Sequence, residues 1–118
     1  MADAGIFIGW GPPVRGRETK GLEVFNESIQ TWSQYEQDGK IESFEVALLA
    51  PHGGDLAGFA LLRGSDEQLD ELRRSDEFQR ITVRAAQIVD GLGVVQAAIG
   101  EGLGTQIGLY QDAVGELT

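Results

Sequence analysis

Two apolar runs joined by a short polar turn are the feature that most constrains the fold of this chain. Residues 41–50 and 56–63 flank the sequence PHGGD at 51–55, a pattern typical of a β-hairpin. Alternation along the first run places apolar groups on both faces: Phe44, Val46 and Leu48 on one, Ile41, Ala47 and Leu49 on the other. The second run carries Phe59 and Leu61 on one face and Leu56, Ala60 and Leu62 on the other. An antiparallel sheet usually needs cover on one face only, so this hairpin predicts a sheet covered on both.

The chain has the size and composition of one globular domain. Its 118 residues are 42% hydrophobic and 24% charged, which is ordinary for a soluble protein, so we predict a single domain over 1–118. Nine basic and 19 acidic residues give a formal net charge of −10. A chain this acidic would be repelled by phosphate backbones, so nucleic acid is not expected as a partner.

Disulfides and membrane insertion are also not expected. The chain has no cysteine, which excludes thiol catalysis as well. Its first residues, MADAG, lack the basic and apolar regions of a signal peptide. No uncharged apolar run approaches the roughly 20 residues of a membrane helix. These observations predict a cytoplasmic protein without a membrane partner.

The first part of the chain predicts a strand followed by a long helix. Residues 5–10 (GIFIGW) form a β-rich run, which two prolines at 12 and 13 end. Four apolar residues then recur at helical spacing on one stripe: Leu22, Phe25, Ile29 and Trp32. The helix is expected over about 17–38, because Gly39 follows as a stop.

Capping signals after the hairpin predict a broken helix, a fourth strand and a final helix. Ser65 and Gln68 have the spacing of a capping box. Ser75 offers a second N-cap, so the helix is expected to break and restart there. The run at 92–99 predicts the fourth strand. Five apolar residues at helical spacing then predict a C-terminal helix: Leu103, Ile107, Tyr110, Val114 and Leu117.

The predicted fold class is α+β and ferredoxin-like, with the order β-α-β-β-α-β, a four-stranded antiparallel sheet, helices on one face and an added C-terminal helix. With its two-sided apolar sheet and the broken helix around Asp76-Glu77-Phe78, the chain resembles the dimeric α+β barrel superfamily. The resemblance implies a homodimer whose sheets face each other, with a cleft between sheet and helices in each subunit. Members include cofactor-independent monooxygenases, polyketide cyclases, isomerases and haem-handling proteins, so the fold leaves the activity open.

His52 and Tyr35 are the candidate catalytic residues. His52 is the only histidine, so any imidazole acid–base chemistry must use it, although its place in the turn also fits a structural role. No second histidine stands at a metal-ligand spacing, so neither a metal nor another cofactor is expected. Tyr35 lies at the edge of the apolar stripe of its helix, which predicts an exposed hydroxyl.

The glycine-rich link at 9–17 joins the first strand to the first helix, where phosphate loops occur. It lacks the Gly-Lys-Ser/Thr ending, and its prolines remove amides that would hold a phosphate. Trp10 still lies at a strand end near Arg15 and Arg17. The three residues together form a candidate binding site for an anion or carboxylate. The competing interpretation is that both arginines are solvated surface charges neutralised by Glu18.

Two functions therefore stay open. The first is a small-molecule-binding protein or a cofactor-independent oxygenase or cyclase, with an apolar or aromatic ligand in a cleft near Trp10, Arg15 and His52. The second is a non-catalytic homo-oligomer in which the apolar sheet face serves assembly alone. An open apolar cleft favours the first, and a core filled by Trp10, Trp32 and Phe59 favours the second. In both cases the second apolar face predicts a homodimer packed sheet against sheet.

Overall fold

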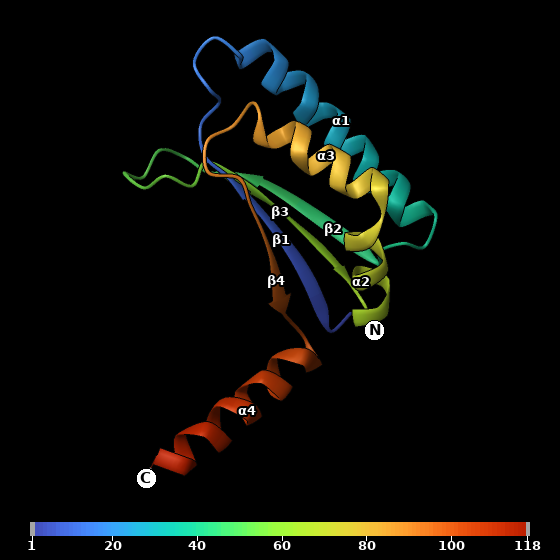
Figure 1. Ribbon diagram of the computed structural model, residues 1–118, viewed down its shortest axis with the longest axis vertical. Helices are drawn as coiled ribbons and strands as arrows, with labels where there is room; N and C mark the ends of the chain where they lie inside the picture. The colour runs from blue at the N-terminus through green and yellow to red at the C-terminus, as the bar shows by residue number, and fades with distance from the viewer. Residues whose placement is uncertain (1, 118) are drawn as a thin grey trace.

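The structure is a computed structural model that describes residues 2–117. Within these residues one four-stranded sheet is combined with four helices (Figure 1). In chain order the elements are β1 Ala4–Trp10, α1 Glu18–Gln37, β2 Ser43–Leu48, β3 Gly58–Gly64, α2 Asp66–Arg74, α3 Asp76–Ala86, β4 Gly93–Ala98 and α4 Glu101–Leu117. The predicted order of elements is confirmed, and so is the break in the second helix.

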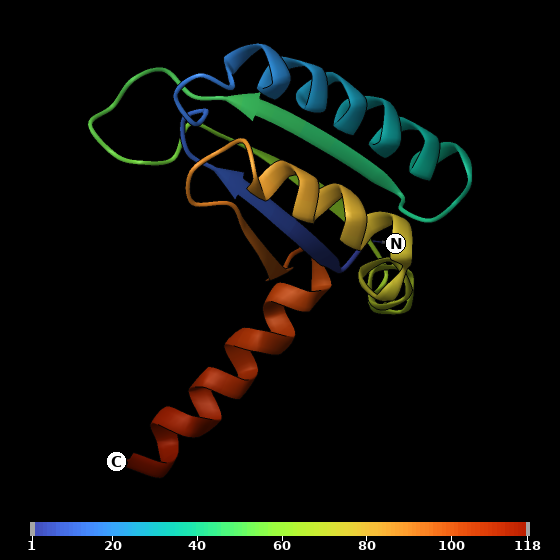
Figure 2. The same ribbon diagram turned by 45° about the horizontal axis from the view of Figure 1, so that its top comes forward.

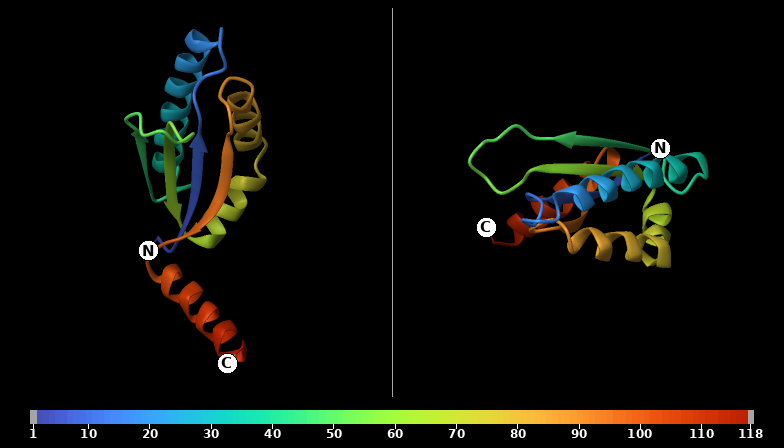
Figure 3. Two further views of the ribbon diagram at one scale, coloured as in Figure 1. Left: turned by 90° about the vertical axis from the view of Figure 1, so that its left-hand side faces the viewer. Right: turned by 90° about the horizontal axis from the view of Figure 1, so that it is seen from above.

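The sheet has the strand order β2-β3-β1-β4, and all its neighbouring strands are antiparallel. The helices α1 and α3 lie over one face, as the views in Figures 1 and 3 show, and none of the described helices lies over the other. We refer to these as the covered face and the open face. The predicted fold class, a four-stranded antiparallel sheet with helices on one face plus a C-terminal helix, is confirmed.

The hairpin predicted over 41–63 is present as β2 and β3, which pair with Phe44 opposite Leu62 and Ala47 opposite Phe59. Its connecting loop covers 49–57 and is longer than the expected turn at 51–55. The prediction that Ile41 shares a strand face with Ala47 and Leu49 is wrong. Ile41 lies before β2, in the turn that ends α1, and is almost completely buried in the core. Strand alternation does not apply there, because its N–H donates to the Tyr35 carbonyl instead of the sheet.

The core lies between the covered face and the C-terminal half of α1 together with α2 and α3. Its buried side chains include Leu62 from β3, Trp32 and Tyr35 from α1, and Phe78 from α3. The Trp32 ring contacts both neighbours, at 5.8 Å from the Tyr35 ring and 5.9 Å from the Phe78 ring. The expected exposed hydroxyl of Tyr35 is therefore wrong, because this side chain is 1% exposed.

Both predicted N-caps are confirmed. The Ser65 side chain accepts from the Gln68 amide at 3.1 Å, and the Gln68 side chain accepts from the Ser65 amide at 2.8 Å, which completes the capping box of α2. The Ser75 hydroxyl oxygen accepts from the Phe78 amide at 3.3 Å at the start of α3. The cap at Ser75 starts α3, and Phe78 in the first turn of this helix packs into the core.

The C-terminal helix α4 is present as predicted, but it extends away from the rest of the chain (Figures 1 and 2). None of its residues is buried. Among the described helices, none is long and apolar enough to cross a membrane.

Candidate functional site

An apolar cavity of about 350 Å³ lies between the covered face and the helices α1 and α3. It occupies the end of the sheet where β1 finishes, next to the core described above. Its main lining residues come from both layers: Ile8, Trp10, Val46, Leu48 and Ala60 from the sheet, Val24, Phe25, Ile29 and Trp32 from α1, and Ile81, Thr82 and Ala85 from α3. The space between the sheet and the two helices is thus filled by the core around Leu62 and Phe78 at one end, the closed end. At the other end, around Trp10, it is left open as the cavity, and we call this the hollow end.

The cavity corrects the interpretation of the helical stripe on α1. Leu22, Phe25 and Ile29 were expected to share one apolar stripe with Trp32, which is the only one of the four that is buried. Leu22 is 63% exposed, and Phe25 and Ile29 are half-buried. The reason is that this part of α1 stands over the cavity, and all four side chains line it.

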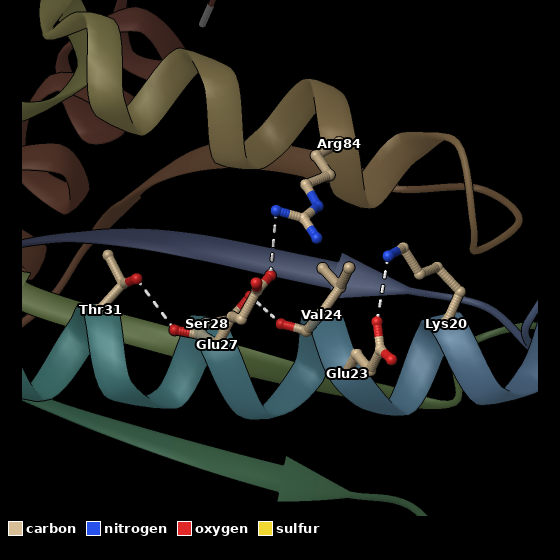
Figure 4. A network of polar contacts seen from close by, with 7 residues as sticks. All are labelled: Lys20, Glu23, Val24, Glu27, Ser28, Thr31 and Arg84. Carbon is tan, nitrogen blue, oxygen red and sulfur yellow. Dashed lines mark hydrogen bonds and ion pairs between the residues drawn. The ribbon is translucent and has the colours of Figure 1, made fainter.

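The two helices beside the cavity are linked at their outer surface by an ion pair. Arg84 of α3 lies 3.3 Å from the Glu27 carboxylate of α1 (Figure 4). Both side chains are about half exposed, at 48% and 47%, so the pair contributes little to stability. The pair shows that the turn of α1 at Glu27 faces the turn of α3 at Arg84.

The link that follows β1 closes the end of the cavity. The Gly11 amide donates to the Asp90 carbonyl at 2.7 Å, the Asp90 amide donates to the Pro12 carbonyl at 3.0 Å, and the Val14 amide donates to the Ile88 carbonyl at 2.8 Å. The Gly11 and Val14 amides thus bond to the segment before β4, so they are not directed at a phosphate. This agrees with the sequence argument against a phosphate loop.

Trp10 forms one wall of the cavity. Its indole lies against Gly58 on the neighbouring strand, where a Cβ atom would stand 2.9 Å from the ring, so the absence of a side chain at 58 makes room for it. On the other side the ring meets Phe25 edge-on, with centroids 6.1 Å apart and planes at 72°. Trp10 is thus placed to contact a molecule in the cavity.

Polar groups are few along the lining. The hydroxyl of Ser28 donates to the Val24 carbonyl at 2.8 Å, and the hydroxyl of Thr82 donates to the Gln79 carbonyl at 2.9 Å. Both hydroxyl hydrogens are therefore engaged within their own helices. Among residues 2–117, Glu18 is the one ionisable side chain of the lining, and its carboxylate accepts from the Gly16 amide at 2.9 Å.

Arg15 and Arg17, predicted to hold a ligand together with Trp10, are exposed and are not part of the cavity lining. The Arg17 guanidinium donates to the Gln87 carbonyl, which attaches the start of α1 to the end of α3. This contact gives Arg17 a structural role. A role of either arginine in ligand binding stays a prediction.

His52 lies in the exposed loop between β2 and β3, away from the cavity lining. Its Nδ1 accepts from the Gly54 amide at 3.2 Å, which leaves the proton on Nε2 to donate to the Leu56 carbonyl at 2.8 Å. Both ring nitrogens therefore bond to the backbone of the loop. The geometry agrees with the structural role considered for His52, and its catalytic role stays a prediction.

Tyr35 is buried in the core and does not line the cavity. Burial first, and the Glu77 carboxylate second, raise the pKa of its hydroxyl above the ordinary value of 10.0. The pair with Glu77 does not meet hydrogen-bond geometry, and the Tyr35 oxygen has no partner of that geometry among the described residues. Its catalytic role also stays a prediction.

The open face of the sheet presents a second apolar surface. The rings of Phe7 and Phe59 stack there with centroids 5.2 Å apart, and Leu61 and Val95 stand opposite Phe7 on the two neighbouring strands. Val95 is 55% exposed. The predicted alternation of the hairpin is thus confirmed for Phe59 and Leu61, which share this face.

Sequence reasoning did not single out most of the residues that line the cavity. Ile81, Ala85 and Ile88 fall on one stripe of a predicted helix, but helical spacing identifies only which residues face inward. It does not show whether the space they face is filled. No signal in the sequence distinguishes this stripe from one that packs against a closed core.

No family model and no curated protein matches this chain. Solved structures do. A dimeric ferredoxin-like protein of unknown function from Jannaschia sp. CCS1 aligns with 81% of this chain and 99% of its own, at a TM-score of 0.64 and 11% identity. A dimeric protein of unknown function and ferredoxin-like fold from Bacteroides fragilis aligns with 81% of this chain and 96% of its own, at a TM-score of 0.58 and 14% identity. The fold is ferredoxin-like.

The chain is also similar to SnoaB, a cofactor-independent oxygenase from Streptomyces nogalater, which aligns with 84% of this chain and 95% of its own. The TM-score is 0.55 and the identity 11%. Resemblance at this level of identity concerns the fold, and the chemistry must be argued from the site.

Proposed function

We propose that this protein binds a neutral, largely aromatic or aliphatic small molecule in the cavity beside Trp10. The observation that carries the proposal is the cavity itself, whose volume of about 350 Å³ lies within the range of small-molecule sites. Its walls are apolar apart from Glu18, Ser28 and Thr82. A ligand there would gain mainly from burial of apolar surface.

The positions of the large aromatic side chains support binding over the purely structural alternative. A core filled by Trp10, Trp32 and Phe59 would leave no room for a ligand. Instead Phe59 lies on the open face beside Phe7, and Trp32 packs against Tyr35 and Phe78. Trp10 lines the hollow end together with Phe25 and Trp32, and the three side chains leave that space unfilled.

The charge of the site favours a neutral ligand. Glu18 is the ionisable residue of the lining, and no arginine or lysine of the described part of the chain joins it there. A carboxylate placed in the cavity would lose its hydration without gaining a cationic partner. If the protein is an enzyme of the cofactor-independent oxygenase type, the cavity would position the substrate, and the Glu18 carboxylate is the lining group able to accept a proton.

Equilibrium dialysis with 2-naphthol and 2-naphthoate tests the proposal. Saturable binding of the naphthol is expected for the wild type and the Trp10→Phe variant, with at least a tenfold weaker affinity for Trp10→Ala. The naphthoate should bind more weakly than the naphthol. If naphthoate bound more tightly than naphthol and the double variant Arg15→Gln/Arg17→Gln abolished this binding, the result would instead support an anion site at the two arginines. Absence of saturable binding for both compounds would contradict the proposal.

We also propose that the open face forms the interface of a homodimer packed sheet against sheet. Phe7, Phe59, Leu61 and Val95 give this face a continuous apolar surface, which monomers rarely expose. Two of the similar structures are described as dimeric, which supports the proposal. The two-fold arrangement would place the same surface on both subunits.

Sedimentation equilibrium at micromolar concentration tests the dimer. The Val95→Asp variant should shift the protein toward monomer, because it places a charge in the proposed interface. Val83→Asp is the matched control, since Val83 is 62% exposed on α3, away from the open face. A wild-type protein that sediments as a folded monomer would contradict this assembly.

A further inference from the structure

The C-terminal helix α4 has an apolar stripe that nothing within the described residues covers. Leu103, Ile107, Tyr110, Val114 and Leu117 are between 41% and 88% exposed. The helix leaves the sheet on the side opposite α1 and α3, as two views agree (Figures 1 and 2). It is therefore not an additional cover for the core.

The direction of α4 is set at its first turn. Gly100 has a positive φ of 53°, which favours glycine. A Cβ atom at Gly102 would collide with the Asp3 carbonyl oxygen at the start of β1, so the helix packs against the chain backbone at this point. The Ile99 amide also donates to the Asp3 carbonyl. α4 is thus held at its base and presents its stripe in a defined direction.

α4 needs a partner surface to stay helical in water. Its sequence EGLGTQIGLYQDAVGEL contains four glycines, and each costs about 1 kcal/mol relative to alanine within a helix. Isolated helices of roughly 12–15 residues are marginal even with favourable sequences. A glycine-rich helix of 17 residues therefore depends on packing of its apolar stripe.

The spacing of the stripe fits another helix. From Leu103 to Leu117 the apolar residues follow intervals of four, three, four and three, which is the spacing of a coiled-coil seam. The charged residues of α4 are Glu101, Asp112 and Glu116. At about 3.6 residues per turn they lie on the side of the helix opposite the stripe, so two such stripes could meet without bringing the carboxylates together.

We propose that the apolar stripe of α4 packs against the same stripe of a second copy of this chain. A two-fold contact requires a self-complementary surface, and an apolar seam with acids only on its far side meets that requirement. An anionic membrane surface fits less well, because α4 has three acidic and no basic residues and the whole chain carries a net charge of −10. The inference does not depend on ligand binding in the cavity.

The area of the open face supports a second contact between the copies. Four strands of about six residues cover roughly 400 Å² of flat surface, about half of the ~800 Å² that each partner buries in a standard interface. α4 adds a strip roughly 25 Å long. Because α4 lies on the open-face side of the sheet, a second copy could contact both surfaces. The pairing thus adds to the sheet contact proposed above.

Cysteine cross-linking tests the pairing, because the chain has no cysteine of its own. Tyr110 is the middle residue of the stripe and is 70% exposed, so in a parallel pair it lies beside its symmetry mate, and in an antiparallel pair centred on the stripe it lies close to the two-fold axis. Under mild oxidation Tyr110→Cys should form a disulfide-linked dimer at least tenfold faster than Asp112→Cys, the matched control on the acidic side. Equal rates for the two variants would contradict the pairing.

Sedimentation of the same proteins separates this inference from the sheet dimer. A dimer that fails to cross-link at Tyr110→Cys would overturn the α4 pairing and leave the sheet interface intact, whereas a wild-type monomer would overturn both. As an independent check, Val114→Glu should weaken dimerisation at least tenfold and reduce the helical circular dichroism. Thr105→Glu, on the side of α4 away from the stripe, should change neither.

Discussion

The two ends of the covered face of the sheet are built from the same kinds of residue but packed differently. At one end Leu62, Trp32 and Phe78 close the space between sheet and helices. At the other end Trp10, Phe25 and Ile81 stand around a cavity of about 350 Å³. Protein interiors are normally close-packed, so the closed end carries the stability of the domain, and the hollow end is where a second molecule can be held.

The largest expected effect is at the closed end. Leu62 is fully buried, so Leu62→Ala should lower the free energy of unfolding by about 2–5 kcal/mol through lost burial and the cavity that remains. Urea unfolding measures this. If Leu62→Ala lowered the free energy of unfolding by less than about 1 kcal/mol, the closed end would be packed as loosely as the hollow end.

A pH-dependent effect of intermediate size is expected from Tyr35. Its pKa is raised above 10.0 by burial and by Glu77, so above pH 10 the unfolded state loses this proton before the folded state does. Stability is therefore full below pH 10 and falls above it, by at most about 1.4 kcal/mol per pH unit for one group. Urea unfolding at pH 9 and pH 11 should show a smaller loss for Tyr35→Phe than for the wild type. Equal losses would exclude Tyr35 as the source.

The smallest effect on stability is expected at the hollow end. Leu48 lines the cavity but is 68% exposed, so Leu48→Ala should change the free energy of unfolding by less than about 0.5 kcal/mol. The same Leu-to-Ala change at 62 and 48 thus compares the two ends directly. If both variants lost similar stability in urea, the distinction between the ends would fail.

Local signals in the sequence predicted much of this fold. Ser65 and Ser75 cap helices where their spacing indicated, because capping depends only on neighbours along the chain. Alternation in the hairpin placed Phe59 and Leu61 on a common face that is open. Ile41 was misplaced because it lies in a turn before β2, where alternation no longer applies.

A cleft between sheet and helices near Trp10 was expected from the resemblance, but the residue pattern alone could not show its walls, because they depend on how side chains from three elements fail to fill the space between them. Trp10 reaches over Gly58 on β3 and meets Phe25 on α1, contacts that no single segment encodes. For the same reason the burial of Tyr35 was missed, since a residue at the edge of a helical stripe becomes buried only when α3 packs beside it.

Filling the cavity tests the central claim most directly. Ala85 lines the cavity, and its neighbour Ala86 is exposed, so Ala85→Phe and Ala86→Phe make the same chemical change inside and outside the site. Calorimetric titration with 2-naphthol should show saturable binding to the wild type and to Ala86→Phe, and a loss of at least tenfold in affinity for folded Ala85→Phe. Equal affinity of all three proteins would contradict the claim that the hollow end of the covered face holds the ligand.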